Sequence, residues 1–421
     1  MVSKQEVEAA YWLVLGRRAE EGDVAHWMTH ADNTLDLLGK FLAAEEFRHH
    51  RLPQLINSGF ALASHQSAEN DRSATPPPPS MRAAIHAGIR SVGLVELERP
   101  SAVAGTIVVK IGAAGICGSD LAVYRTVDQK MTLPRGHEYS GVVVEKGDDV
   151  DSVAIGQRVT VDIFLESACG KCVFCRKGYP RHCTMRGRVT EGGFAEYVRV
   201  NAAAAFPLPD SVDDALGALT EPLAVAVHVV RKMAISRGMS GVVIGAGTIG
   251  LMAVAAAVDA GAERVYVVAR HPFQAEAALA LGATDILPAG HADALATVLA
   301  ESKYGVDFAI EAVGDRAATL DEACHYVRPL GTVGVLGAFA SGYSGLQPFV
   351  PSVKEQNIVF SNCYGYLNGI HDFEVAIELL SRKGGAIRKS ITHAFALSEI
   401  SAAFRVADNK DFKSIKVQVK P

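Results

Sequence analysis

Residues 242–250 read Val-Val-Ile-Gly-Ala-Gly-Thr-Ile-Gly, and most of the architecture follows from what this short segment requires. Three apolar β-branched residues predict a short strand, and three glycines at the spacing G-x-G-x-x-G follow at once. Gly245 permits a tight turn, Gly247 lets the backbone approach a pyrophosphate, and Gly250 lets the next helix pack closely against the strand. The segment therefore predicts a dinucleotide site at a strand-to-helix turn.

The helix that this turn introduces begins at Thr248 and Ile249, and its first backbone N–H groups have no partner within the helix. These groups and the positive end of the helix dipole favour phosphate. Three more apolar strands alternate with helices further along, which indicates a parallel sheet with right-handed crossovers. A glycine-rich turn in an unrelated α/β protein is the alternative. Because strand and helix both lie where the motif needs them, we assign residues 224–360 to a Rossmann domain.

The regions on either side of the predicted Rossmann domain have different sequence patterns. Residues 81–223 carry short β-branched runs separated by glycines, which predicts a strand-rich domain, and residues 361–421 return to it with a final strand. Residues 1–62 have apolar side chains at three- and four-residue steps and predict a small all-α domain. Residues 63–80 are polar, contain four consecutive prolines and predict a linker.

The end of the strand after the glycine motif indicates which cofactor is preferred. A carboxylate that recognises the ribose 2′-hydroxyl is expected about 20 residues beyond the glycines. The sequence has Ala269 there, followed by Arg270. Loss of the carboxylate removes repulsion of a 2′-phosphate, and a guanidinium can pair with it. NADP is therefore predicted in preference to NAD, the alternative being that Arg270 is a solvated loop residue.

Four of the seven cysteines lie within fifteen residues, at the spacing C-x2-C-x2-C-x7-C. Four thiolates suit a closed tetrahedral zinc site of structural type, since no position is left for water. Reduced buried thiols are the alternative, but such clustering in a chain with few cysteines favours metal. The predicted ligands are Cys169, Cys172, Cys175 and Cys183.

A second candidate set is spread along the chain. Cys117 lies in GICGSD, His137 and Glu138 lie in GHEYSG, and Glu221 lies in LTEPLA. None is convincing alone, because a cysteine beside glycine is often buried core and a His-Glu pair is often surface. Together they supply the sulfur, imidazole and carboxylate ligands of an open catalytic zinc site, with one position left for water or substrate.

Composition excludes several classes of function. The 421 residues include 41 Lys and Arg and 46 Asp and Glu, a formal net charge of −5, so nothing favours nucleic acid or anionic membrane as a partner. No apolar run is long enough to span a bilayer, and the N-terminus lacks the apolar core of a secretion signal. A cytoplasmic protein is expected.

From residue 81 onward, these motifs resemble the zinc-containing medium-chain alcohol dehydrogenases, most nearly the sorbitol, polyol and threonine dehydrogenase branch. The resemblance covers about four fifths of the chain. It implies an α/β plus β-barrel fold, in which a chaperonin-10-like (GroES-like) domain carries catalytic zinc and a Rossmann domain binds the cofactor. It also implies a secondary alcohol or its ketone as substrate, with polyols and sugars favoured, and a homo-oligomer, either a dimer or a tetramer. The matching pieces are residues 115–120, 136–147, 221–223, 245–250 and 311–314 and the four-cysteine segment.

The resemblance also implies residue roles. Cys117 and His137 would be zinc ligands, and Glu138 and Glu221 compete for the remaining place, one bound directly and the other through water. Ser119 would take the alcohol proton into a relay, although a turn-capping hydroxyl is an equal alternative. Hydride would pass to the nicotinamide. The further expected cofactor contacts are Val313 and Gly337.

One departure from the family pattern concerns the proton relay. Polyol dehydrogenases usually carry a histidine five residues after the zinc cysteine, where this sequence has Ala122. The outer proton carrier is therefore missing, or another group such as Tyr124 or a cofactor hydroxyl replaces it. A repurposed cofactor-binding scaffold without turnover remains an alternative, as does a zinc-independent reductase of the same fold.

The N-terminal residues carry a second resemblance. Residues 11–17 and 41–48 are similar to an uncharacterised bacterial helical domain that often accompanies surface-glycan proteins. This gives only a hint of sugar chemistry. A docking or oligomerisation helix pair is the interpretation that we prefer for residues 1–62.

Overall fold

The computed structural model describes residues 80–187, 192–288, 290–315, 317–339 and 345–421, together with the isolated residues Val7 and Met28. The predicted helical domain at 1–62 and nearly all of the predicted linker at 63–80 lie outside these residues. Residues Pro77–Pro421 form one compact unit. Within the described residues, none of the helices has the length and apolar character that crossing a bilayer requires.

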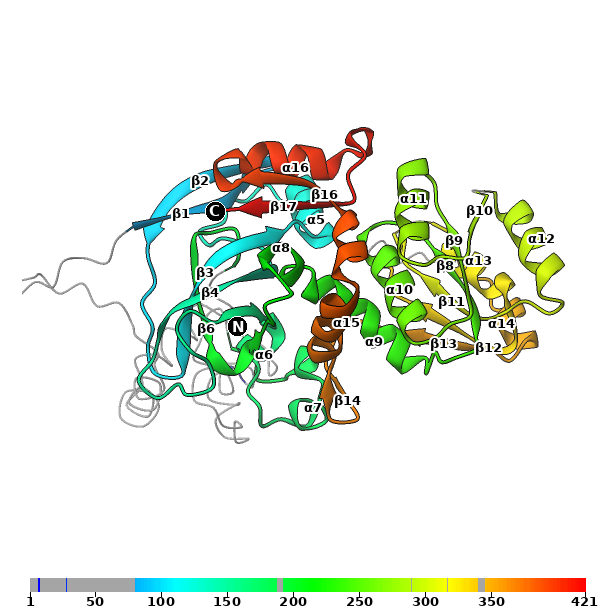
Figure 1. Ribbon diagram of the computed structural model, residues 1–421, viewed down its shortest axis with the longest axis horizontal. Coiled ribbons are helices and arrows are strands. Elements are labelled where there is room, and N and C mark those ends of the chain that lie inside the picture. Colours follow the sequence, from blue (N-terminus) through cyan, green and yellow to red (C-terminus); the bar gives the residue numbers. More distant parts are fainter. Residues whose placement is uncertain are drawn as a thin grey trace, which may run out of the picture. The chain divides into compact units, whose positions relative to one another are not determined.

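Residues 242–244 form the strand predicted for them, at the centre of a six-stranded parallel sheet (Figure 1). Counted along the chain, its strands have the spatial order 3-2-1-4-5-6, the order of a dinucleotide-binding sheet. The first and fourth strands are neighbours, so a crevice is expected at their carboxyl ends. The strands in chain order are β8 (Ser240–Ile244), β9 (Arg264–Val268), β10 (Asp285–Leu287), β11 (Val306–Glu311), β12 (Val327–Val335) and β13 (Asn357–Phe360).

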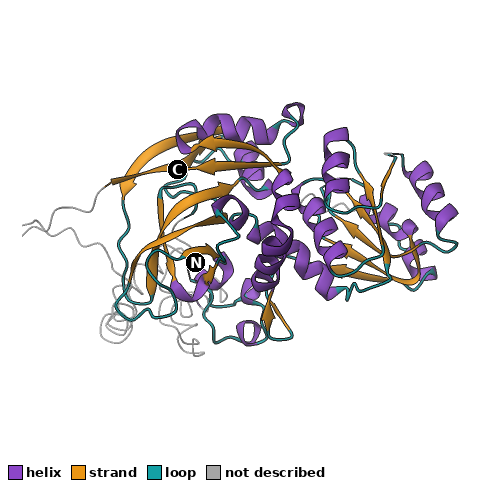
Figure 2. Cartoon of the chain, in the orientation of Figure 1, coloured by secondary structure: helices purple, strands orange, loops and turns teal. Residues whose placement is uncertain are grey.

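Helices cover both faces of this sheet, because its strands are apolar on both sides (Figure 2). Val243 belongs to one buried cluster, with side chains of the helices next to it, whereas its neighbours Val242 and Ile244 belong to another cluster on the opposite face. The first face carries α9 (Thr220–Lys232), α10 (Thr248–Asp259) and α11 (Pro272–Ala280), and the second carries α12 (His291–Glu301) and α13 (Thr319–Tyr326).

The strand-rich part forms a second sheet, of seven strands, in which all pairs but one are antiparallel. The last two strands come from the C-terminal tail, so the chain returns to this sheet after leaving the parallel one. Their inward side chains form a separate core. The strands are β3 (Thr106–Gly115), β4 (Glu138–Lys146), β5 (Arg158–Val161), β6 (Tyr197–Asn201), β7 (Ala205–Pro207), β16 (Ile391–Ala396) and β17 (Lys416–Lys420).

Shorter elements surround the two sheets. Strands β1 (Ser80–Gly88) and β2 (Ser91–Glu98) form an antiparallel pair, as do β14 (Tyr366–Leu367) and β15 (Ile370–His371). Residue 224, the expected start of the Rossmann domain, lies inside α9, which contacts β4 of one sheet and β12 and β13 of the other. The remaining helices are α5 (Gly118–Thr126), α6 (Ile163–Ser167), α7 (Val173–Arg176), α8 (Asp214–Gly217), α14 (Phe349–Val353), α15 (Asp372–Ile387) and α16 (Ile400–Asp408).

Candidate metal centre and cofactor site

Three residues of the dispersed set meet at the end of the β3–β4 pair. Gly115, near the end of β3, lies opposite Glu138, the first residue of β4. Cys117 follows β3 as the N-cap of α5, and His137 directly precedes β4. One ligand atom from each of Cys117, His137 and Glu138 lies within 4.8 Å of the other two. The antiparallel register thus brings together groups that are twenty residues apart in the sequence.

Glu221, the fourth predicted residue, lies in the first turn of α9 and is buried. It is not part of the group whose ligand atoms lie within 4.8 Å of one another. Burial raises the pKa of Glu221 from 4.5 to about 8, and the negative charges of Glu138 and Cys117 add to this effect. The carboxyl group of Glu221 therefore lies in a buried space that disfavours its charged form.

The other two groups respond to the same surroundings. Burial raises the pKa of the Cys117 thiol to about 11, and the charge of Glu138 contributes. Burial opposes the charged form of His137, yet its pKa is raised because the carboxylates of Glu221, Asp120 and Glu138 favour the imidazolium. A bound cation would favour the ionised forms of these acidic groups, because its positive charge would lie close to them.

One cation of the chain already lies beside this site. Lys416 of β17 pairs with Glu138, with 2.5 Å between Nζ and Oε2, and both side chains are almost completely buried. Its Nζ also donates to the carbonyl oxygen of Ile116 at 3.1 Å. The sequence patterns do not single out Lys416. The available signal is a lysine between two apolar residues, Ile415 and Val417, at the start of the tail strand.

The predicted proton-relay residues separate in the structure. Ser119 is exposed in the first turn of α5, and its hydroxyl interacts with the Cys117 thiol. Ala122 is exposed on the same helix. Tyr124 instead lies in the core, with its ring 5.2 Å from that of Phe404, and burial raises its pKa. This position gives Tyr124 no route to an alcohol at Cys117.

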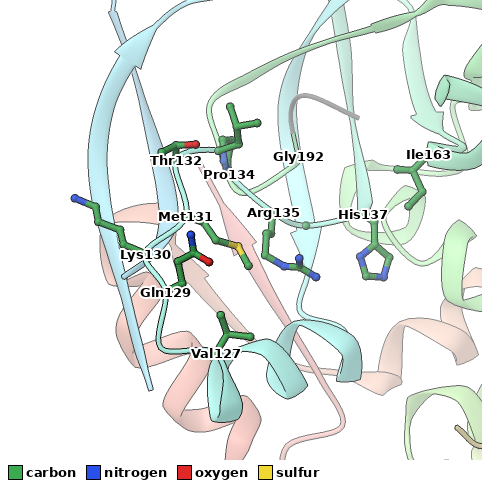
Figure 3. Close-up of a pocket in the computed structure, with 12 residues that line it drawn as sticks. Val127, Gln129, Lys130, Met131, Thr132, Pro134, Arg135, His137, Ile163 and Gly192 are labelled. Atoms are coloured by element: carbon green, nitrogen blue, oxygen red, sulfur yellow. The ribbon is translucent and has the colours of Figure 1, made fainter. Parts of the chain in front are cut away.

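A cavity of about 510 Å³ opens beside His137 (Figure 3). We call it cavity 1. Its wall consists of Val127 and the segment from Gln129 to His137, completed by Ile163 and Gly192. Among the described residues, the lining includes the cations Lys130 and Arg135 but no carboxylate. Arg135 lies 3.4 Å from Asp120, measured from Nε to Oδ1, whereas the side chain of Lys130 extends away from the imidazole of His137 in Figure 3.

The four clustered cysteines lie together around α7. Their sulfur atoms all lie within 4.8 Å of one another. Backbone N–H groups of Lys171 and Cys172 donate to the sulfur of Cys169, and the N–H of Cys169 donates to that of Cys183. Hydrogen bonds from the backbone N–H groups of Cys175 and Thr184 lower the pKa of Cys172 to about 5. Such donors favour thiolates, the form that binds metal.

The glycine turn has the conformation that its sequence requires. Gly245 has φ of +97° and donates its N–H to the carbonyl oxygen of Val268 at 3.1 Å. A Cβ at Gly250 would lie 1.8 Å from the carbonyl oxygen of Gly245, so the helix can approach only without a side chain there. A Cβ at Gly247, the N-cap of α10, would meet nothing within 4 Å. The helix N-terminus therefore faces open space and has no side-chain cap.

The remaining predicted cofactor residues surround this turn. The Thr248 hydroxyl donates to the carbonyl oxygen of Ile415 at 3.0 Å. The backbone N–H of Thr248 lies in the first turn of α10, which has no side-chain cap. Val313 is 46% exposed after β11, and a Cβ at Gly245 would lie 2.7 Å from its side chain. Gly337 follows β12, and a Cβ there would collide with Glu311. The structure places the other three residues around the same crevice: Ile249 in the first turn of α10, and Ala269 and exposed Arg270 after β9.

Comparison with known proteins shows which family combines these two metal-ligand clusters with a dinucleotide-binding turn. Residues 103–210 match the alcohol dehydrogenase GroES-like domain, and residues 248–382 match the zinc-binding dehydrogenase domain. Sorbitol dehydrogenase of Bacillus subtilis (strain 168) is 30% identical over 356 residues, which cover 82% of this chain and 98% of that protein. The chain belongs to the zinc-containing medium-chain alcohol dehydrogenase family. As a member, it is an NAD(P)-dependent oxidoreductase with a small-molecule alcohol as substrate.

Other members of the family agree. L-Threonine 3-dehydrogenase of Bacillus velezensis is 36% identical over 234 residues, covering 53% of this chain and 67% of that protein. A dehydrogenase structure from Sinorhizobium meliloti 1021, described as zinc-binding and bound to NADP, superposes with a TM-score of 0.71 at 29% identity and covers 82% of this chain and 100% of its own. An alcohol dehydrogenase from Escherichia coli CFT073 complexed with NADH has the same TM-score and identity, covering 81% and 99%.

Proposed function

We propose that this chain is a zinc-dependent dehydrogenase that interconverts a secondary alcohol of polyol or sugar type and its ketone, with NADP(H) preferred. The observation that carries the proposal is the convergence of Cys117, His137 and Glu138 within 4.8 Å beside cavity 1. Thiolate, imidazole and carboxylate are the ligands that zinc accepts in open catalytic sites. Bound there, zinc would polarise the alcohol oxygen and lower its pKa.

The third protein ligand is proposed to be Glu138. Its carboxylate belongs to the converging group, and Glu221 does not. Lys416 engages Oε2 of Glu138, so the second oxygen is the one left for a metal. Glu221 would then act through water, since it lies outside the converging group. Cys117 and His137 serve as ligands in either arrangement.

The proton of the alcohol needs an acceptor near Cys117. Ser119 is the candidate in this chain, because its hydroxyl is exposed and interacts with the Cys117 thiol. A hydroxyl can accept one proton while it donates its own, which is what a relay requires. With Ala122 in place of histidine and Tyr124 buried in the core, the next acceptor is proposed to be water or a cofactor hydroxyl.

The cofactor preference rests on the end of β9. Arg270 is exposed there, and Ala269 takes the place of a carboxylate. We expect Arg270→Ala to lower kcat/KM with NADP by about 10-fold, because a charge-assisted hydrogen bond contributes about 1.5–3 kcal/mol, while activity with NAD changes little. Arg264→Ala is a matched control, since Arg264 is at the opposite end of β9 and pairs with Glu301 of α12. Steady-state kinetics with both cofactors decide, and a preference for NAD in the unchanged chain would contradict the proposal.

The direct test of the function is a panel of polyols and their ketones, assayed with NADP(H) and NAD(H) before and after zinc removal. Turnover of at least one compound that disappears with a chelator and returns with zinc supports the proposal. Turnover that survives complete zinc removal would favour a zinc-independent reductase. A chain that binds NADPH but turns over none of the compounds would favour a scaffold.

A further inference from the structure

A second cavity, of about 460 Å³, lies between the cysteine segment and the ends of β12 and β13. We call it cavity 2. Its lining contains the cations Arg181 and Lys232 and the imidazoles of His182 and His228, and no carboxylate is among the described residues that line it. The chain as a whole carries a net charge of −5, so a cavity whose described lining holds two cations and no carboxylate differs from the average of its surface. Such a lining attracts an anion.

The imidazole of His228 is held in a fixed orientation. Its Nδ1 lies 2.6 Å from Oδ2 of Asp372, and Oδ1 of Asp372 accepts from Arg231 at 2.5 Å. The N–H of Gly365 also donates to Oδ2 at 2.9 Å. An ionised carboxylate only accepts, so Nδ1 of His228 carries the proton. Its Nε2 has no partner among the described residues, and the ring lines cavity 2.

Two further groups of this cavity have unused hydrogen-bonding capacity. Ser361 is 7% exposed, and its Oγ is buried with no hydrogen-bond partner in the described structure. Lys232 donates one hydrogen to the carbonyl oxygen of Phe360 at 2.7 Å, and an ammonium group has three. A buried hydroxyl without a partner costs about 1–3 kcal/mol, so its retention beside a cationic cavity points to a ligand.

Helix α9 carries residues of both cavity 2 and the surroundings of the candidate metal centre. Glu221 and His228 are seven residues apart on this helix, which places them on the same face about 10 Å apart along the axis. Gly337, one of the expected cofactor contacts, also lines the cavity. Cys363, next to Ser361 and Asn362 in the chain, interacts electrostatically with both Glu221 and Arg181. A substrate that occupies both sites would have to span this distance of about 10 Å along α9.

We propose that cavity 2 binds an oxyanion at the far end of the substrate, so that the substrate is a phosphorylated or carboxylated polyol rather than a neutral one. This inference rests on the proposed function. Lys232 and Arg181 supply the charge, and Ser361 and His228 supply directed hydrogen bonds. The cofactor phosphates are not the expected occupant, because neither Gly247 nor Arg270 lines this cavity.

Calorimetric titration of the zinc-loaded full chain tests the inference. NADPH is kept bound so that no alcohol can be oxidised during the measurement. The probes are sorbitol 6-phosphate, gluconate and sorbitol, which share a carbon chain and differ in the terminal group. We expect an anionic probe to bind about 10- to 100-fold more tightly than sorbitol, as charge-assisted hydrogen bonds imply. The two charged probes distinguish phosphate from carboxylate.

Single-residue variants show which cavity is responsible for the tighter binding of the anionic probe. Lys232→Gln is expected to remove about tenfold of the advantage of the anionic probe and to leave sorbitol binding unchanged. Ser361→Ala is expected to weaken the anionic probe about fivefold without lowering the melting temperature, because its hydroxyl has no partner in the fold. Lys303→Gln is the matched control, since Lys303 is exposed and lines neither cavity. Lys130→Gln tests whether the anionic probe binds in cavity 1 instead.

Each possible outcome either supports or overturns the inference. Equal affinity for charged and neutral probes would overturn the inference, and so would a larger loss with Lys130→Gln than with Lys232→Gln. If sorbitol is oxidised well and binds as tightly as its phosphate, the inference fails while the proposed function stands. If no alcohol is oxidised but the anionic probe binds in a Lys232-dependent manner, the proposed function fails and the anion site stands.

Discussion

The two candidate metal clusters of this chain are built in opposite ways. The four cysteines lie within fifteen residues, and local backbone N–H groups surround their sulfur atoms. Cys117, His137 and Glu138 come from the ends of two strands, and a lysine about 280 residues away completes their surroundings. A cluster made by one loop depends on that loop, whereas a cluster made by several elements depends on the whole fold. Changes at the two should therefore have different consequences.

The largest expected effect is on catalysis at the dispersed cluster. His137→Ala removes a ligand and leaves the four cysteines untouched, so kcat/KM should fall by about 10⁴-fold, or more than 5 kcal/mol, while the melting temperature changes little. The measurement is steady-state kinetics on the best substrate of the polyol panel. His325→Ala, a histidine of α13 that lines neither cavity 1 nor cavity 2, is the control for a general effect of histidine loss. Activity of His137→Ala within tenfold of the unchanged chain would show that the cluster is not the reaction centre.

The next effect concerns the dependence of the dispersed cluster on the fold. Lys416→Met leaves the buried carboxylate of Glu138 without its ion-pair partner, which typically lowers the free energy of unfolding by about 3–5 kcal/mol. Denaturant unfolding of the metal-free chain measures it. The double variant Glu138→Gln with Lys416→Met should recover part of the loss, because no charge then remains unpaired. Additive losses in the double variant would mean that the pair is not coupled.

A smaller effect is expected from the local cluster. Cys172→Ser should lower the melting temperature by at least about 5 °C, since 1 kcal/mol corresponds to about 2–4 °C for 150–250 residues. The kcat at a temperature where the chain remains folded should stay within about threefold, which is less than 1 kcal/mol. Cys324→Ser is a control, because Cys324 is a buried cysteine outside both clusters. A large loss of kcat without loss of stability would reverse the proposed roles of the two clusters.

The last effect is a pH dependence of the metal-free chain. The pKa of Glu221 is raised from 4.5 to about 8 by burial, so the folded state binds a proton that the unfolded state has released between these values. Its contribution to stability is fully present below about pH 4.5 and is lost as the pH rises toward about 8. Glu221→Gln should flatten this part of the profile in chemical unfolding at several pH values. An unchanged slope in the variant would place the titration elsewhere.

The fold was largely predictable because its signals are local. The glycine spacing at 245–250 requires a strand before it and a helix after it, and β8 and α10 have those positions. Elements without a local signal were not predicted. Helix α15 contains Gly384 and Gly385, which ordinarily weaken a helix, yet it continues to Ile387 because Gly384 packs against Leu216 of α8. A close approach between elements cannot be read from the residues of one element.

The candidate site was predictable to a similar degree. Cys117, His137 and Glu138 lie in recognisable short motifs, and the structure brings them together. Lys416 was missed because its partner Glu138 is 278 positions away and because four consecutive residues of β17 are buried, which hides the alternation expected of a half-exposed strand. Cavity 2 was missed for the same reason, since Lys232, Ser361 and His182 become neighbours only in the folded chain.

Elemental analysis of purified protein, expressed as zinc per chain, tests the central claim most directly. The account predicts nearly two zinc per chain, falling to one in Cys117→Ser with stability retained and to one in Cys172→Ser with kcat retained. One zinc in the unchanged chain that persists in Cys117→Ser, or none at all, would contradict a zinc-bearing reaction centre at Cys117, His137 and Glu138.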